Sequence, residues 1–228
     1  MDTMFDTLLQ LPLFQGMTLE DLTHIVGKTK MHFEKYKAQE IIELAGEPCQ
    51  RFTFVLNGEV EVITTSPDGS YSFTEYYEAP YLIEPQSMFG LTPNYASTTK
   101  AVHTVSTVCI DKLTVMKQLF NYEIFRLNYQ NIISVRAQHL QRRLWIEPEE
   151  GIKRRMVQFF QMHIERMSGR KLVKIKMDTM ALILNETRLS VSKALNQMQD
   201  SGLLVLRRGE VEIPDAAQLL SILTQEEF

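Results

Sequence analysis

The stretch from Asp178 to Gln199, DTMALILNETRLSVSKALNQMQ, contains two short helix patterns separated by one tight polar break. Met180 and Ile183 give the first helix an apolar side, and Ala181 is small enough for another helix to cross closely. Asn185 is able to take the left-handed backbone conformation that the turn requires. Two abutting helices joined by such a turn predict a helix-turn-helix.

Thr187 starts the second helix, and the residues that follow separate into two faces. One face is apolar and is expected to pack inward, at Val191, Ala194, Leu195 and Met198. The other face carries Arg188, Leu189, Ser192, Lys193 and Asn196. We expect this second face to meet the major groove of DNA.

Charge is distributed unevenly along the chain, although the net charge of its 228 residues is only −4. Residues 1–148 hold 12 lysines and arginines against 17 acidic residues, a net of −5. Residues 151–208 hold 12 lysines and arginines against four acidic residues, a net of +8. Because phosphate contacts supply most of the non-specific affinity for DNA, this local surplus matters more than the total.

The sequence lacks the signals of export, of a membrane span and of a disulfide framework. No run approaches the roughly 18 apolar residues of a span, and the first residues, MDTMFDTLLQLPLF, carry acids rather than a basic segment. Cys49 and Cys109 are the only cysteines, too few for a disulfide framework or a four-thiolate cluster. A hydrophobic content of 44% allows a sizeable core. We therefore expect a globular, cytoplasmic protein.

Residues 31–110 consist of short apolar or alternating runs separated by turn residues, a pattern typical of β structure. The Asn57-Gly58 and Asp68-Gly69 pairs are the strongest hairpin signals. Strands this short and evenly spaced predict a barrel or sandwich. The clearest strand candidates are Glu40 to Leu44, Arg51 to Leu56, Glu59 to Thr65 and Ser70 to Tyr77.

Residues 111–147 contain neither glycine nor proline and show apolar residues at helical spacing, so a long helix is expected there. Its apolar residues form a narrow seam at Ile133, Ala137, Leu140 and Leu144. A seam of this kind can pair with its own copy, which favours a two-fold homodimer. Packing of the seam on the β region is the alternative that stays open.

Glu147-Pro148 is expected to end the long helix and to form a hinge, because the residue before a proline is pushed out of the helical region. A second domain follows, with an amphipathic helix at 149–167 and an alternating strand at 172–176. Two further strand patterns, at 203–206 and 210–213, enclose the turn Arg207-Arg208-Gly209 and predict a wing. The composite is a winged helix-turn-helix.

This order of elements resembles the Crp/Fnr family of bacterial transcription regulators, named for the cyclic-AMP receptor protein and the fumarate-nitrate reduction regulator. The resemblance spans nearly the whole chain and implies an α+β fold. That fold comprises a cupin-like, cyclic-nucleotide-binding-like β-roll sensor at 1–110, a dimerisation helix at 111–147 and a winged helix-turn-helix at 148–228. Its carriers are Leu13-Phe14, Gly46-Glu47, FTFVLNGEVEV at 52–62, MFGL at 88–91, the long helix and the helix-turn-helix with its wing.

By position, Thr187 and Ser190 match family sites that contact phosphate or support the start of the helix. Arg188 and Lys193 match sites where arginines often reach base edges or phosphates; an arginine fork suits guanine O6/N7, whereas a lysine brings only a point charge. Leu189 stands where the best-known members have a glutamate that accepts from cytosine, so a different base preference is expected. The full expected DNA-binding set is Thr187, Arg188, Leu189, Ser190, Ser192, Lys193, Asn196, Arg207 and Arg208.

The sensor departs further from the family. Nucleotide-binding members have a glutamate just after the Phe-Gly pair, for the ribose, and an arginine farther along, for the phosphate. Here Leu91 replaces the acid, and residues 92–99 contain no cation. Since a buried phosphate without a charged partner is costly, we expect no tight binding of cyclic AMP. Any small effector is expected to contact Phe89, Gly90, Leu91, Ser97, Thr98 and Thr99, with Asn131 and Ser134 from the long helix.

Other sensor chemistries lack their residues. Residues 1–48 contain no cysteine for an iron–sulfur cluster, and the scattered histidines do not form a haem motif, so no cofactor and no metal are expected. Cys49 and Cys109 are expected to be ordinary free thiols, with a redox pair as the minor alternative.

The motifs of common hydrolases, zinc proteases and phosphate-binding enzymes are absent from the sequence, so an enzyme is not expected. The preferred hypothesis is a homodimeric, sequence-specific regulator that binds operator DNA and is controlled by an effector other than cyclic AMP. RNA polymerase is a further expected partner. The alternative is a β-roll module that binds a partner or small molecule without specific DNA recognition.

Overall fold

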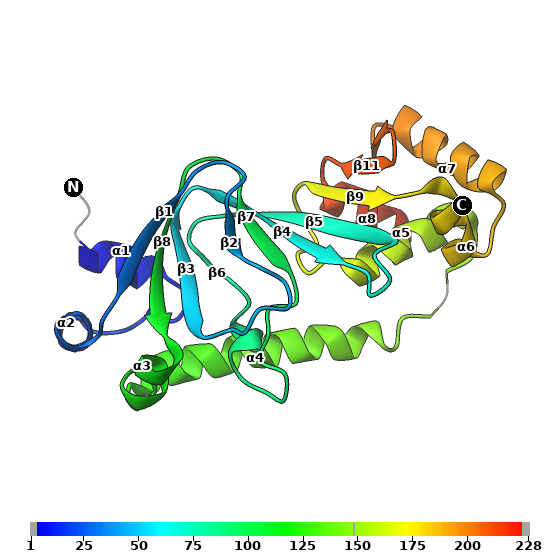
Figure 1. The fold of residues 1–228 in the computed structure, drawn as a ribbon. Coiled ribbons are helices and arrows are strands. Elements are labelled where there is room, and N and C mark those ends of the chain that lie inside the picture. Colours follow the sequence, from blue (N-terminus) through cyan, green and yellow to red (C-terminus); the bar gives the residue numbers. More distant parts are fainter. Residues whose placement is uncertain (1–3, 148, 225–228) are drawn as a thin grey trace. The chain divides into compact units, whose positions relative to one another are not determined.

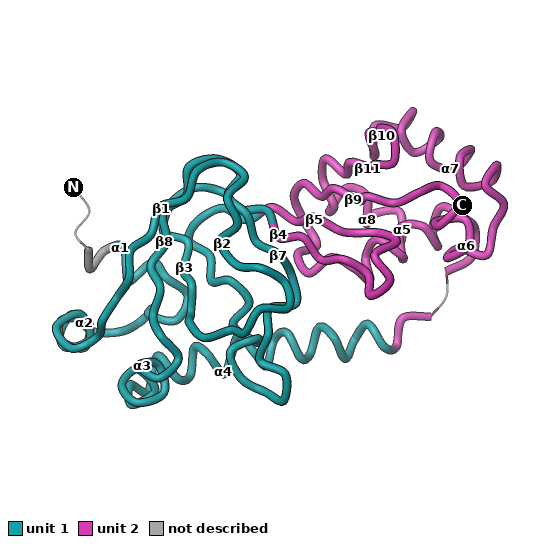
Figure 2. The backbone as a smooth tube through the Cα atoms, in the orientation of Figure 1, with its two compact units in different colours: residues 1–61, 77–144 teal, residues 62–76, 145–228 magenta. Residues whose placement is uncertain are grey.

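The computed structural model describes residues 4–147 and 149–224. These residues fall into two compact units (Figure 2). The N-terminal unit comprises the residues up to 61 together with 77–144, and the C-terminal unit comprises 62–76 together with the residues from 145 onward.

The N-terminal unit contains the expected β-roll, preceded by two helices and followed by one long helix (Figure 1). The β structure predicted for residues 31–110 and the cupin-like β-roll implied by the family resemblance are thereby confirmed. Its elements, including two strands that run on into the other unit, are α1 (Met4–Gln10), α2 (Leu19–Lys28), β1 (His32–Tyr36), β2 (Ile41–Glu43), β3 (Arg51–Asn57), β4 (Glu59–Thr65), β5 (Tyr71–Glu78), β6 (Tyr81–Leu82), the 3-10 turn η1 (Pro85–Met88), β7 (Thr98–Ala101), β8 (Val105–Asp111), α3 (Lys112–Lys117), η2 (Leu119–Asn121) and α4 (Glu123–Arg143).

An aromatic cluster holds the roll and the start of α4 together. One antiparallel sheet has the strand order β1-β8-β3-β6, and β3 buries four successive residues. The rings of Phe14 and Phe54 lie 5.7 Å apart, and those of Phe14 and Phe125 lie 5.1 Å apart. All three phenylalanines are fully buried. Since each such side chain contributes roughly 1.5–3 kcal/mol by burial, the cluster is a principal source of stability in this unit.

One of the two predicted hairpins is a corner instead. Asp68-Gly69 joins β4 to β5, which are neighbours in one sheet, as predicted. Asn57-Gly58, however, joins β3 to β4, and these strands belong to different sheets, so the prediction of a hairpin there was wrong. Gly58 has φ +97, and an added Cβ would lie 2.6 Å from the carbonyl oxygen of Thr104. The glycine is therefore needed for a close backbone crossing rather than for a two-residue hairpin turn.

The helix expected over residues 111–147 is interrupted and ends early. α3 stops at Lys117, η2 follows, and α4 begins only at Glu123 and ends at Arg143. The interruption places the ring of Phe120 5.8 Å from Phe89 and 5.4 Å from Tyr129, while Leu119 is fully buried. A continuous helix would turn some of these side chains to solvent, so burial outweighs helix continuity here. Pro148, the expected hinge residue, lies outside the described residues.

The C-terminal unit is the predicted winged helix-turn-helix with one more helix at its end (Figure 1). The sequence patterns did not single out that last helix, α8. The elements are α5 (Ile152–His163), β9 (Lys171–Ile175), α6 (Met177–Leu184), α7 (Arg188–Asp200), β10 (Val205–Arg207), β11 (Glu210–Ile213) and α8 (Ala216–Thr224).

A strand from far upstream completes the sheet of the C-terminal unit. Residues 71–75 of β5 pair antiparallel with 171–175 of β9, which gives the strand order β10-β11-β9-β5. Phe73 is buried, with its ring 4.9 Å from that of His163 and 5.6 Å from that of Phe159. The hairpin tip is therefore part of the C-terminal core, which no pattern in the sequence signals.

A buried ion pair accompanies this strand pairing. Lys171 Nζ lies 3.0 Å from Glu75 Oε1, and the two side chains are 1% and 11% exposed. Glu75 also accepts hydrogen bonds from the backbone N–H groups of Glu165, at 2.7 Å, and Arg166, at 3.1 Å. The carboxylate thus fixes both the strand register and the segment after α5.

Replacing Glu75 by alanine is expected to destabilise the C-terminal unit by about 3–5 kcal/mol, because Lys171 is left as a buried, uncompensated charge. The matched control is Glu210→Ala, which breaks the exposed pair between Lys174 and Glu210, where Lys174 is 57% exposed. That change is expected to cost at most about 1 kcal/mol. Urea unfolding followed by circular dichroism measures both, and equal losses would contradict the prediction.

Candidate nucleic-acid interface and sensor interior

The turn between α6 and α7 is built on Asn185. This residue has φ 52 and ψ 48, the left-handed conformation predicted from the sequence. The N–H of Asn185 donates to Leu182 O at 3.2 Å, and that of Glu186 donates to Ala181 O at 2.9 Å. These bonds satisfy the last carbonyls of α6, and asparagine tolerates the conformation better than most residues.

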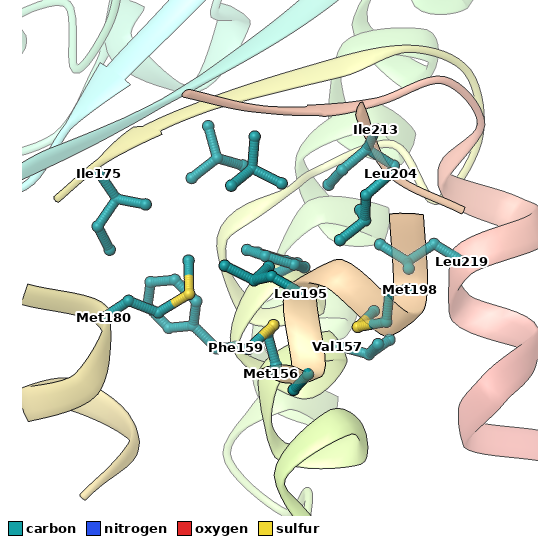
Figure 3. Close-up of a cluster of buried hydrophobic side chains, with 14 of the residues drawn as sticks. Met156, Val157, Phe159, Ile175, Met180, Leu195, Met198, Leu204, Ile213 and Leu219 are labelled. Atoms are coloured by element: carbon teal, nitrogen blue, oxygen red, sulfur yellow. The ribbon is translucent and has the colours of Figure 1, made fainter. Parts of the chain in front are cut away.

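α7 starts at a side-chain cap and is anchored by its apolar face. Thr187 Oγ1 accepts a hydrogen bond from the N–H of Ser190 at 3.1 Å, as a threonine does in front of a helix. The four residues predicted to pack inward are buried, at Val191, Ala194, Leu195 and Met198. Figure 3 shows Leu195 and Met198 within a cluster that includes Met156, Val157 and Leu219.

Arg155 of α5 holds the helix-turn-helix from behind. Its guanidinium donates to Leu184 O at 2.9 Å, at the end of α6. It also forms an ion pair with Glu186 in the turn. One arginine therefore fixes the end of one helix and the approach to the next. Sequence reasoning missed Arg155 and Glu186 because they are 31 residues apart.

The predicted DNA-binding residues of α7 lie on its outward face. Arg188 and Leu189 are 71% and 80% exposed. Lys193 is exposed and forms no ion pair with any residue that the structure describes. Ser190 and Ser192 are half-buried, and Asn196 donates to Ser192 O at 2.7 Å. Asn196 thus already satisfies one of its donors within the helix.

The only ion pair of Arg188 within the described chain is with Asp178 of α6, at 3.5 Å. Asp178 is 74% exposed, so water and salt screen the pair. An exposed pair of this kind contributes about 0–1 kcal/mol, which a DNA contact can replace. Asp178 therefore orients the Arg188 side chain through a weak contact that leaves its guanidinium accessible from solvent.

The wing places two more cations beside α7. Arg207 and Arg208 are exposed, and the N–H of Leu206 donates to Gln199 Oε1 at 2.8 Å, which ties the wing to the end of α7. A cleft of about 580 Å³ lies between the wing, the start of α6 and α7. Met180, Leu195 and Leu206 contribute apolar lining, and the cations along it are Lys176, Arg188, Arg207 and Arg208.

The residues predicted to contact an effector are found in different environments. Ser97 and Thr99 are buried, and the hydroxyl of Thr99 has no hydrogen-bond partner among the described residues. Phe89 and Thr98 are half-buried, and Phe89 packs against Phe120 and Tyr129 of the helical segment. Gly90, Leu91, Asn131 and Ser134 are exposed, Leu91 completely so.

The interior of the roll contains a polar network that sequence analysis did not foresee. Arg51 forms ion pairs with Glu34 at 2.9 Å and Glu43 at 3.0 Å, and Thr53 Oγ1 donates to Glu43 at 2.6 Å. Burial acts to raise the pKa of Glu34, but a hydrogen bond from Tyr36 and the charge of Arg51 outweigh it, so that pKa is lowered. Both glutamates therefore hold Arg51 in place.

The two cysteines lie close to this network and are free thiols. Each is 1% exposed, and burial raises the pKa of both. Cys109 Sγ lies 3.6 Å from Thr53 Oγ1, and Cys49 Sγ donates to Arg51 O at 3.7 Å. A raised pKa keeps a thiol protonated and unreactive, so the surroundings favour structural cysteines.

Two further findings concern binding classes. Within residues 4–147 and 149–224, no group of three or more His, Cys, Asp or Glu side chains is placed to hold a metal ion. None of the helices in the described part of the chain has the length and apolar content needed to cross a bilayer.

The fold defines the class of protein. It is a β-roll domain followed by a winged helix-turn-helix whose outward face is basic. Comparison with protein-family models agrees with this class. Residues 33–122 match the cyclic nucleotide-binding domain, and residues 154–222 match the Crp-like helix-turn-helix domain. The chain belongs to the Crp/Fnr family of DNA-binding transcription regulators, which are regulators rather than enzymes.

Solved structures with a similar fold include several regulators. The catabolite activator protein of Thermus thermophilus is 17% identical, with 93% of this chain and 98% of that chain covered and a TM-score of 0.49. DNR from Pseudomonas aeruginosa is 19% identical, with 97% and 98% covered and a TM-score of 0.46. The c-di-GMP responsive regulator CLP of Xanthomonas campestris is 13% identical, with 86% and 99% covered and a TM-score of 0.49. A search of the curated proteins found no match.

Both thiols are expected to react slowly with a disulfide reagent such as DTNB. Because their pKa values are raised, little thiolate is present even at pH 8, and the native protein should react on the order of 100-fold more slowly than the unfolded chain. Absorbance of the released thionitrobenzoate measures the rate. Rapid native reaction of either cysteine, identified with Cys49→Ser and Cys109→Ser, would contradict the structural role.

Proposed function

We propose that this chain is a homodimeric, sequence-specific transcription regulator. In it, a β-roll sensor at 1–110 and a dimerisation helix at 111–147 control a DNA-binding domain at 148–228. The observation that carries the proposal is the two-faced burial of α7. Its apolar face is fixed in the core, while Arg188, Leu189 and Lys193 are presented together to solvent. An α-helix exposed in this way fits the major groove of DNA.

Each side chain has a distinct contact that its chemistry suits. The fork of Arg188 is able to donate to both O6 and N7 of one guanine, and Leu189 offers an apolar contact to a thymine methyl. Lys193 supplies a point charge, and Arg207 and Arg208 supply guanidinium groups, for contacts to phosphates that hold the protein on the duplex without specifying sequence. Thr187, Ser190, Ser192 and Asn196 complete the proposed interface as hydroxyl and amide donors.

The proposal of a dimer is supported by an uncovered seam along α4 and its C-cap residue, Leu144. Leu140 and Leu144 are 60% and 81% exposed, and Ala137 is exposed, whereas Ile133 is half-buried. Exposed leucines at this spacing are typical of a surface that pairs with a second copy. In a two-fold dimer, an effector acts by favouring the arrangement in which the two α7 helices lie about 34 Å apart, one turn of DNA.

The effector is proposed to be other than cyclic AMP. Leu91 occupies the position where nucleotide-binding members have a glutamate, and its side chain is fully exposed. Arg51, a half-buried cation of the roll, is already paired with two glutamates. RNA polymerase is proposed as a further partner, since regulators of this kind act at promoters.

Substitution of Arg188 tests the proposed base contact. The preferred site is first identified by selecting bound sequences from a random DNA pool. The Arg188→Ala variant is then expected to bind this site with about 1–3 kcal/mol less free energy and to discriminate less between bases at one base pair. Arg188→Lys keeps the charge but not the fork, and should relax the same position. Fluorescence anisotropy on the selected site and its variants provides the measurement.

Lys193→Ala is the matched comparison for Arg188, because it lies on the same face but is proposed to bind phosphate. The variant should bind all DNA sequences more weakly by a similar factor. The magnitude of the slope of log affinity against log salt concentration should fall by about 1. The DNA assignment fails if neither the unmodified protein nor either variant shows salt-dependent binding. That result would instead favour a β-roll module that binds only a partner or small molecule.

Replacing Leu140 and Leu144 together by glutamate is expected to abolish the dimer, because four buried carboxylates would face one another across the two-fold axis. Affinity for a two-fold symmetric site should fall on the order of 100-fold as bivalent binding is lost. Sedimentation equilibrium measures the mass. The control replaces Gln138 and Gln141, exposed and outside the seam, by glutamate, and a dimer unchanged by the leucine substitutions would place the interface elsewhere.

A further inference from the structure

The last carbonyl of α6 finds its hydrogen-bond donor on another helix. An α-helix leaves its final four carbonyls without intrahelical partners. The N–H groups of the turn between α6 and α7 donate to two of these, on Ala181 and Leu182. The carbonyl of Leu184, at the very end of α6, accepts instead from Arg155 Nη1 of α5 at 2.9 Å.

The same guanidinium holds the turn on both sides of its left-handed residue. Arg155 contacts Leu184, which precedes Asn185, and forms an ion pair with Glu186, which follows it. Residues other than glycine adopt the conformation of Asn185 at an energetic cost. Fixing both neighbours restricts rotation about φ and ψ of the residue between them. We call these two contacts the Arg155 clamp.

The start of α7 depends on this clamp more than the rest of the helix does. The buried face of α7 begins only at Val191. The exposed Arg188 and Leu189, which are proposed to reach bases, precede the first buried residue. Arg188 lies only two positions after Glu186, with the cap residue Thr187 between them. The clamp therefore acts at the end of α7 that carries the proposed base contacts.

A bidentate contact between an arginine and a guanine has narrow geometric limits. Both donors must lie within about 3.2 Å of their acceptors, with N–H groups that point at them. A small change in the direction of the first turn of α7 is enough to lose one of the two hydrogen bonds.

We propose that Arg155 is a positioning residue for DNA recognition. It acts without touching DNA, by fixing the turn from which Arg188 and Leu189 project. Arg155 itself projects from a helix that is fixed in the core, where Met156 and Phe160 are fully buried. This inference rests on the proposed DNA-binding function and assigns to Arg155 a part of its sequence preference.

Arg154, the preceding residue of α5, provides a matched control. It forms an ion pair with Glu149 at 2.7 Å and donates to the carbonyls of Ile222 and Leu223 at 3.1 and 3.0 Å. The side chains of Arg154 and Glu149 are 23% and 24% exposed, against 32% and 25% for the pair at the turn. The two arginines thus make similar contacts, but Arg154 holds the end of α8 instead of the turn.

The test compares full-length Arg155→Lys with Arg154→Lys, because lysine keeps the charge and loses the fork. The Tm of each variant should fall by about 4–8 °C, as one hydrogen bond of ordinary strength is lost. Only Arg155→Lys should bind the selected DNA site about tenfold more weakly and discriminate less against its single-base variants. The slope of log affinity against log salt concentration should stay unchanged in both, since no charge is removed.

Fluorescence anisotropy, at a temperature well below both Tm values, measures these affinities. Equal losses of affinity in the two variants would show that reduced stability is the cause, and would overturn the proposal. Unchanged discrimination in a folded Arg155→Lys variant would overturn it as well.

Glu186→Gln covers the case in which Arg155→Lys does not fold. Removal of a negative charge beside the proposed DNA-binding face would by itself raise the affinity for all sequences. The clamp predicts in addition that discrimination between the selected site and its single-base variants falls on the order of tenfold. The control Glu149→Gln should keep that discrimination. Higher affinity of Glu186→Gln with unchanged discrimination contradicts the clamp.

Hydrogen exchange tests the clamp without DNA. The amide of Ser190 donates to the cap residue Thr187. Its exchange, measured by NMR, should be at least about tenfold faster in Arg155→Lys than in Arg154→Lys. Equal exchange in the two variants rejects the clamp, whatever the protein does with DNA. Absence of salt-dependent DNA binding by the unmodified protein instead overturns the proposed function, and with it the role of Arg155 in recognition.

Discussion

The burial of one side of α7 is the constraint on which the functional surface depends. Leu195 and Met198 are 1% exposed, within the C-terminal core. Rotating the helix would expose these side chains and leave cavities in the core. The cost in folding free energy would be several kcal/mol, on the order of that of large-to-small core substitutions. Because the helix is fixed in this orientation, Arg188 and Lys193, which project from its opposite side, must point toward solvent. The core thus sets the orientation of the face proposed to bind DNA.

That core is not made by the C-terminal sequence alone. Residues 71–75 contribute a strand to its sheet, Phe73 packs among its aromatic rings, and Glu75 neutralises the buried Lys171. β4 and β5 run on from this hairpin tip into strands of the N-terminal unit. The segment that helps to orient α7 is therefore covalently continuous with the β-roll. β4 and β5 contribute residues both to the proposed sensor and to the core of the DNA-binding domain that it is proposed to control.

The N-terminal unit pairs several of its buried and half-buried polar groups internally. Glu34 and Glu43 hold Arg51, the backbone N–H groups of residues 96 and 97 hold Glu84, and both cysteines are buried as protonated thiols. The cyclic nucleotide-binding fold is present, and the buried hydroxyl of Thr99 is left without a hydrogen-bond partner in the described residues.

The sequence by itself determined those features that depend on neighbouring residues. The two faces of α7, the left-handed Asn185, the cap at Thr187, the Asp68-Gly69 hairpin and the wing follow from local periodicity and turn chemistry, which act within a few residues. Only the tertiary structure decided the pairing of β5 with β9, the clamp of Arg155 on the turn, the corner at Gly58, the break before α4 and the partners of Glu84. Each of these depends on contacts between residues that are far apart in the sequence. A local sequence pattern does not specify which distant residues will make such contacts.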